Sequence, residues 1–211
     1  MTNAEYLCSL LSVLPPNLEE IEKELKSKNY SSEEVTEAAC EFCRECFLEY
    51  TDFIDAHNRE PYKNEIHSSY VYDICKLLLE YGLDPNLVLG EKFSETNIMY
   101  EVYWITKPYV AADTLRLLLE HGGNPMLIFD DEPFYHMVDL DIWFDVTEGY
   151  YTDPWYKVKF DCIFHFWLVL LGAVAEEGSD EKNYINHEDY IPAITKTDEY
   201  NWDIGVKKKN K

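Results

Sequence analysis

Three cysteines stand at a spacing that metal and iron–sulfur sites use. Cys40, Cys43 and Cys46 form a C-x2-C-x2-C run, which in cluster-binding proteins lies in a flexible loop with a fourth cysteine nearby. Here the run falls within a stretch of strong helical periodicity, and Cys75 and Cys162 are isolated rather than paired at a zinc-ribbon spacing. We therefore interpret the cysteines as free core thiols and expect no metal and no cofactor.

Two other groups contain residue types that catalyse reactions. Cys162 and His165 are three residues apart, a spacing at which helical side chains can touch. Their neighbours are apolar, whereas a catalytic thiol needs exposure and an orienting third group. Asp139 and Asp141 form the D-x-D pattern of some sugar transferases, without the surrounding α/β pattern. Because no phosphate loop, G-x-S-x-G or H-E-x-x-H motif occurs, we predict no enzyme activity, with Cys162 and His165 as the enzymatic alternative.

The most unusual feature is a gap in positive charge, since no Lys or Arg occurs between Arg116 and Lys157. Aromatic residues alternate with acids in this gap, and the turn residues of 149–156 place part of it at the surface. Aromatic anchors beside carboxylates are suited to a partner rich in Lys and Arg. The predicted partner-binding residues are Asp130, Asp131, Glu132, Asp139, Asp141, Trp143, Asp145, Glu148, Tyr150, Tyr151, Asp153 and Trp155. The alternative is an acidic, solvated loop over a packed helix.

The composition limits the class of partner. The net charge is −23, and 46% of the residues are hydrophobic, which is typical of a globular protein. Negative charge disfavours direct binding to nucleic acid or to an anionic membrane and favours a protein with a basic surface, although it can also serve solubility alone. The first residues lack the positive start of a signal peptide, and the apolar run 162–175 is too short to span a bilayer. We expect a cytoplasmic protein.

Helical periodicity predicts the elements that position these groups. Amphipathic helices are expected at residues 18–28, 33–57, 70–81, 111–121 and 156–175, and Ser31 and Glu34 have the spacing of a capping box. Residues 179–211 are expected to be rich in loops, with a short helix at 187–195 and a frayed tail from residue 207.

Two of these helices end in the same way. Residues 77–86 are LLLEYGLDPN and residues 117–126 are LLLEHGGNPM, so each helix meets a glycine stop and then a proline turn. Upstream, Glu60-Pro61-Tyr62, Thr96-Asn97-Ile98 and Glu132-Pro133-Phe134 recur at equal intervals. Each triplet combines a polar residue and a turn former with an apolar residue that opens a helix.

These residues carry a resemblance to the ankyrin repeat, whose units open with T-P-L-H and close with L-L-x-x-G-A-D-P-N. The chain departs from that pattern because it has no Thr-Pro-Leu-His tetrad, and the resemblance covers about residues 60–175. It implies an all-α fold of stacked helical hairpins forming a short ankyrin-like solenoid. Residues 1–59 would be an N-terminal helical cap, 60–178 the repeats and 179–211 an extension, within one continuous domain. Another all-helical stack is the alternative.

The resemblance also implies a function, because ankyrin proteins generally bind other proteins and lack catalysis of their own. With the acidic charge, it favours an inhibitor or immunity protein that binds and neutralises a basic partner such as a nuclease toxin. Two alternatives stay open: a general ankyrin-like scaffold whose acidity gives only solubility, and a decoy inhibitor of a nucleic-acid-binding protein. The sequence does not indicate an oligomeric state.

Overall fold

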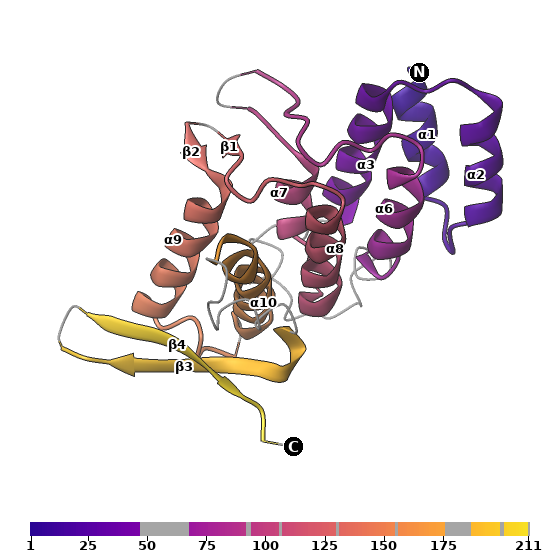
Figure 1. The fold of residues 1–211 in the computed structure, drawn as a ribbon. Coiled ribbons are helices and arrows are strands. Elements are labelled where there is room, and N and C mark those ends of the chain that lie inside the picture. The colour runs from indigo at the N-terminus through magenta and orange to yellow at the C-terminus, as the bar shows by residue number, and fades with distance from the viewer. Residues whose placement is uncertain are drawn as a thin grey trace.

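The computed structural model describes residues 1–46, 68–91, 94–105, 107–129, 131–154, 156–175, 187–198 and 201–210. These residues form mostly helices (Figure 1). The helices are α1 (Asn3–Leu11), α2 (Leu18–Ser27), α3 (Ser32–Cys46), α6 (Val71–Leu79), α7 (Ile98–Tyr103), α8 (Pro108–Glu120), α9 (Phe134–Thr147) and α10 (Lys157–Val174). The strands are β1 (Ile128–Phe129), β2 (Glu132–Pro133), β3 (Tyr190–Lys196) and β4 (Trp202–Lys208), and η3 (His187–Asp189) is a 3-10 turn.

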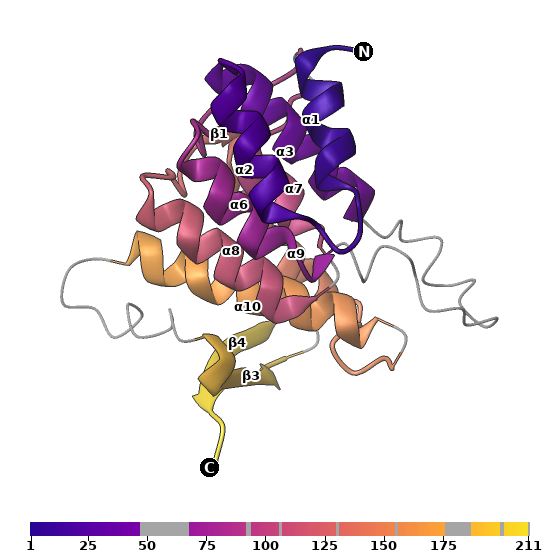
Figure 2. The same ribbon diagram turned by 90° about the vertical axis from the view of Figure 1, so that its right-hand side faces the viewer.

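The helices lie in layers that follow the order of the chain (Figure 2). Helices α1 and α3 pack together at one end, α6 and α7 lie between α3 and α8, and α10 packs against α8 and α9. The β3–β4 hairpin lies beneath α10 at the opposite end from the N-terminus. One continuous apolar core joins these layers and extends from Leu7 on α1 to Tyr190 on β3.

The N-terminal helices begin at polar caps. Thr2 and Glu5 form a capping box on α1, and Asn17 accepts a hydrogen bond from the backbone N–H of Glu20 at the start of α2. The predicted box before α3 is confirmed, since Ser31 and Glu34 bond each other's backbone N–H at 3.1 and 2.9 Å. Helix α3 is described as far as Cys46. The predicted continuation to residue 57 and the triplet at residues 60–62 lie outside the described residues.

The first turn, which we define as residues 82–97, follows α6. Gly82 has φ +101°, a left-handed conformation that favours glycine and stops the helix. Asn97 then caps α7 by accepting from the N–H of Met99 at 2.8 Å. Its amide also donates to the carbonyls of Pro85 and Leu87, at 2.8 and 3.2 Å. The predicted glycine stop at Gly82 and the predicted helix opening at Ile98 are both confirmed.

The second turn, residues 122–133, follows α8. That helix begins at Pro108 rather than at residue 111, because proline suits the first helical position, where no N–H is needed. Gly122 has φ +92°, and β1 pairs with β2 in an antiparallel ladder before α9 opens at Phe134 as predicted. The carbonyls of Pro125 and Leu127 accept backbone N–H groups at 3.0 and 2.8 Å. The two turns therefore use corresponding carbonyls as acceptors.

The C-terminal segment differs from the all-α prediction. Within residues 187–198 and 201–210, η3 is the only helical turn, and β3 pairs with β4 where a short helix and loops were predicted. Lys207 and Lys208 lie in the ladder rather than in a frayed tail. Trp202, Ile204 and Val206 alternate along β4 and pack against the core. Burial of every second side chain stabilises a strand, which is why this segment is not helical.

Candidate functional site

Helix α9 has an exposed apolar stripe on the side that faces away from the core. Leu140, Trp143 and Phe144 are 62%, 49% and 50% exposed, and spacings of three and four residues place them on one side of the helix. Val138, Ile142 and Val146 on the opposite side are buried, and α9 packs against α10. We call the stripe, with the carboxylates that flank it, the α9 outer face. Exposed clusters of large apolar side chains mark interaction sites.

Carboxylates flank the stripe on both sides. Asp139 accepts a hydrogen bond from Nε1 of Trp167 on α10 at 3.0 Å. Asp141 accepts one from the hydroxyl of Tyr103 on α7 at 2.6 Å, and burial together with this carboxylate raises the pKa of Tyr103 well above its usual value. Glu148 is exposed at the end of α9. The bonds to the helical body fix two of the carboxylates at the edges of the apolar stripe.

Asp145 does not belong to the outer face, although it was among the predicted binding residues. Only 4% of it is exposed, on the inner side of α9. Burial raises the pKa of Asp145 to about 6, with an opposing effect from Lys159 and a smaller upward effect from Asp141. A carboxylate in this position cannot pair with a basic residue of a partner.

The segment that follows α9 contributes one aromatic side chain to the face. Tyr150 stacks on Tyr156, with ring centroids 4.4 Å apart, and meets Phe144 edge-on at 6.1 Å. Tyr151 instead packs against Phe160 and Trp202 in the body of the protein. Tyr150 therefore extends the outer face, whereas Tyr151 positions the segment.

The remaining predicted residues lie around the two ends of α9. Asp131 and Glu132 are exposed at the β1–β2 connection that leads into the helix. The backbone carbonyl of Asp153 accepts the N–H of Lys157 at 3.0 Å, where α10 begins. Asp130 and Trp155 lie outside the described residues.

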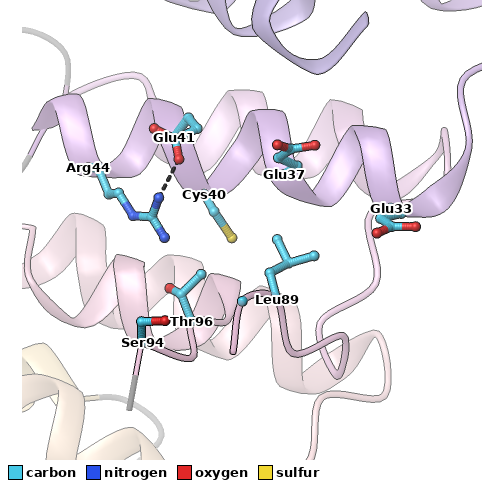
Figure 3. A pocket seen from close by; sticks show the side chains of 9 residues that line it. Glu33, Glu37, Cys40, Glu41, Arg44, Leu89, Ser94 and Thr96 are labelled. Atoms are coloured by element: carbon cyan, nitrogen blue, oxygen red, sulfur yellow. Dashed lines mark hydrogen bonds and ion pairs between the residues drawn. The ribbon is translucent and has the colours of Figure 1, made fainter. Parts of the chain in front are cut away.

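A second candidate site, which the sequence analysis missed, is a pocket between α3 and the first turn (Figure 3). Its volume is about 320 Å³. Glu33, Glu37 and Glu41 lie four residues apart along one side of α3 and line one wall. The remaining lining residues are Cys40, Arg44, Leu89, Gly90, Ser94 and Thr96. The spacing of the three glutamates is a sequence signal, but the wall opposite them depends on tertiary packing.

The cationic side of this pocket is already paired. Arg44 forms an ion pair with Glu41 and donates from Nε to Glu101 at 2.7 Å. Glu101 is buried and also accepts a hydrogen bond from Thr96. Arg44 therefore compensates a buried carboxylate rather than presenting a free positive charge, and the pocket keeps an acidic wall.

The thiols show no sign of activation. All six cysteines are free and buried. Cys162 donates from Sγ to the carbonyl of Ile105 at 2.7 Å, and burial raises its pKa to about 12. His165 instead lies against Tyr109 and His187. The side chains of Cys162 and His165, the predicted enzymatic alternative, therefore each contact different residues. Among the residues that the structure describes, no three His, Cys, Asp or Glu side chains are grouped to hold a metal ion.

Comparisons with protein-family models, with curated proteins and with solved structures give no match to this chain. None of the helices in the described ranges combines the length and the hydropathy that a bilayer span requires.

Proposed function

We propose that this chain is a non-catalytic protein-interaction module that binds a partner with a basic surface through the α9 outer face. The observation that carries the proposal is the exposed stripe of Leu140, Trp143 and Phe144 with carboxylates at its edges. Large apolar side chains supply most of the binding energy in such interfaces, and charged edges select the partner. The hydrogen bonds that hold Asp139 and Asp141 reduce the entropy lost on binding.

The charge distribution supports a neutralising role. The net charge is −23, and no Lys or Arg occurs between Arg116 and Lys157, the interval that contains α9. A surface of one sign accelerates association with a partner of the opposite sign. We therefore propose an acidic inhibitor or immunity protein that occupies the basic surface of a partner such as a nuclease toxin. Its association rate should fall as salt concentration rises, because salt screens the attraction.

We also propose that the helical layers form a short ankyrin-like solenoid with an N-terminal helical cap. The support is the repeated glycine stop at Gly82 and Gly122, together with the corresponding carbonyl acceptors of the two turns. The side chain of Asn86 links the turns, since it bonds the carbonyl of Gly122 and the N–H of Asn124, at 2.9 and 2.8 Å. In solenoids of this kind the turns and adjacent helices form the binding surface, which agrees with the position of α9 directly after the second turn.

The proposal is tested by comparing surface variants in capture from cells of the source organism and in binding kinetics with the captured protein. Trp143→Ala combined with Phe144→Ala should abolish capture of a single basic partner. Glu132→Lys combined with Glu148→Lys should slow association at least about tenfold at low salt. Reversal of Asp139, Asp141 or Asp145 is a poorer test, because these side chains are bonded to the body or buried.

Matched controls use the far end of the molecule. Val13→Ala removes another exposed apolar side chain, and Glu19→Lys with Glu20→Lys reverses two exposed acids on α2. These variants should bind like the wild-type chain. Undiminished capture by the Trp143 and Phe144 variant would refute the α9 outer face. If neither salt concentration nor charge reversal changes the association rate, the result would instead favour a general scaffold whose acidity gives solubility.

A further inference from the structure

Two buried histidines meet where the C-terminal hairpin joins the helical body. His165 on α10 and His187 on η3 are 5% and 0% exposed, and their ring centroids are 5.3 Å apart. The ring of Tyr109 on α8 lies 4.7 Å from His165 and 5.8 Å from His187. We call these three side chains the histidine cluster. It brings α8, α10 and the start of the hairpin together at one point.

Each imidazole in the cluster is only partly hydrogen-bonded. Nδ1 of His165 and Nδ1 of His187 have no partner in the described part of the chain. Nε2 of His187 lies 3.4 Å from Oδ1 of Asp113, and the main chain of His187 bonds the His165 ring. A neutral ring tolerates one unpaired acceptor nitrogen at moderate cost, but protonation adds a buried charge and turns that nitrogen into an unsatisfied N–H donor. The cluster therefore suits two neutral imidazoles.

The charges that face the cluster act in both directions, since the acids favour protonation of His187 and the cations oppose protonation. These charges are Asp113 and Arg116 on α8, Lys157 on α10, Glu188 on η3 and Lys209 after β4. Asp113 is already paired with Arg116 at 2.7 Å. Lys209 donates from Nζ to the hydroxyl of Tyr109 and to the carbonyl of Glu188, at 3.1 and 2.7 Å. Burial, with these neighbouring cations, lowers the pKa of His165 to about 4. Burial also lowers the pKa of His187, despite the opposing effects of Asp113 and of Glu188, whose carboxylate lies 3.7 Å from Nε2.

The position of the hairpin depends on this junction. A two-stranded hairpin is marginally stable by itself, so β3 and β4 need the helical body. Contacts of η3 with α8 and α10, and of β4 with α9, attach the hairpin. Trp202 adds an edge-on contact with Tyr151 at 6.1 Å. Loss of the contacts at η3 would leave the hairpin attached through the apolar side chains of its two strands, such as Tyr190 and Ile194 on β3 and Trp202 on β4.

We propose that the histidine cluster is a pH-sensitive latch that holds the β3–β4 hairpin on the helical body at neutral pH and releases it in acid. Solvated histidines titrate near pH 6.5, so the released state binds protons that the docked state excludes. Docking consequently weakens as pH falls below about 6.5, by up to about tenfold per pH unit for each histidine, until the docked rings also protonate. The inference does not depend on the proposed partner.

Hydrogen exchange and histidine NMR on the full chain test the latch. After correction for the intrinsic exchange rate at each pH, amides of β3 and β4 should lose at least about tenfold protection between pH 6.5 and 4.5, relative to α3. In the double variant His165→Gln with His187→Gln, baseline protection of the hairpin changes but its dependence on pH should disappear. His121→Asn, which removes an exposed histidine outside the cluster, should behave like the wild-type chain.

Two results would overturn the proposal. One is a ratio of amide protection between the hairpin and α3 that stays constant down to pH 4.5. The other is an equal acid-induced loss in the double variant. The ring resonances of His165 and His187 supply a separate test on the unmodified chain, because ordinary titration near pH 6.5 with the hairpin still docked would contradict the latch.

Discussion

The first and second turns begin with the same helix end and the same glycine stop, yet their surroundings differ. The first turn is fixed by α3, since the hydroxyl of Ser32 donates to the carbonyl of Gly82 at 2.6 Å and that of Thr36 accepts the N–H of Asp84 at 3.0 Å. The second turn leads through β1 and β2 into α9, whose outer face is exposed. The same type of turn is therefore packed against α3 in the first case, and in the second case it leads into a helix with an exposed face.

The donors that close the two turns differ as well. In the first turn a single side-chain amide, that of Asn97, bonds the carbonyls of Pro85 and Leu87. In the second turn backbone N–H groups bond the carbonyls of Pro125 and Leu127. A mutation can remove the first set of bonds but not the second, so the first turn should be the more sensitive to substitution.

The largest expected effect is that of Asn97→Ala, which removes the side chain that closes the first turn. It should lower the free energy of unfolding by about 3 kcal/mol, because two carbonyls and the cap of α7 lose a bond at a buried position. Asn124→Ala in the second turn should cost about 0.5 kcal/mol, since among the described residues its exposed side chain bonds just the N–H of Met126. Equal costs in urea denaturation would remove the distinction between the turns.

Asp145→Asn should act in the opposite direction and raise the free energy of unfolding by up to about 3 kcal/mol at pH 7. Burial raises the pKa of Asp145 to about 6, so ionisation at neutral pH opposes folding, at about 1.4 kcal/mol per pKa unit. The gain should shrink as pH falls through 6 and vanish below about 4, where the carboxyl is protonated in both states. Denaturation curves at pH 4, 5.5 and 7 measure it.

Glu101→Gln supplies the matching change on the side of the first turn. Glu101 is buried, but its carboxylate forms an ion pair with Arg44 at 2.7 Å and accepts a hydrogen bond from the hydroxyl of Thr96. Loss of this charge should destabilise the protein by about 1 kcal/mol at pH 7, since it breaks a compensated pair. A gain in stability would show that the buried acids near the two turns are equivalent.

Alanine at the two glycine stops should reveal what the turns share. Gly82→Ala and Gly122→Ala should each cost about 1 to 2 kcal/mol, because both residues have positive φ. A Cβ at Gly122 would meet nothing within 4 Å, and one at Gly82 would meet Ser32 at an ordinary 3.8 Å. Backbone strain therefore determines both costs, and thermal denaturation should find them equal within about 0.5 kcal/mol. A clear inequality would show that contacts with α3 decide the effect.

A small effect is expected for Asn86→Ala, which removes the link between the turns. Two hydrogen bonds to Gly122 and Asn124 would be lost at a partly exposed position, at a cost of about 1 kcal/mol. Hydrogen exchange should accelerate more in the second turn than in the first, because α3 still holds the first. Equal acceleration in both turns would contradict this asymmetry.

The helix ends and openings could be predicted from the sequence because they depend on local chemistry. Asn97 caps α7, and Gly82 and Gly122 stop the preceding helices, as the sequence predicts. The C-terminal hairpin was not predicted, and Pro192, which cannot donate to a strand ladder, interrupts the strand pattern there. The alternation of Trp202, Ile204 and Val206 was the signal that favoured a strand.

The candidate site was predictable in composition but not in orientation. The charge gap correctly located a segment with exposed aromatic side chains, among them Trp143. The inward position of Asp145 follows from its spacing with Val138 and Ile142, which the sequence analysis did not use. The bonds of Asp139 and Asp141 to α10 and α7 connect residues far apart in the chain, and no local pattern reveals such contacts.

The register of the hairpin has a mechanical consequence. Lys208 at the end of β4 pairs with Tyr190 at the start of β3, and the remaining pairs follow in order to Lys196 and Trp202. A pulling force applied at the C-terminal end of β4 would therefore load these pairs one after another, as in a zipper, rather than all together in shear. An unfolding motor that pulls from that end would meet low resistance at first. The helical layers would unravel only after the hairpin had opened.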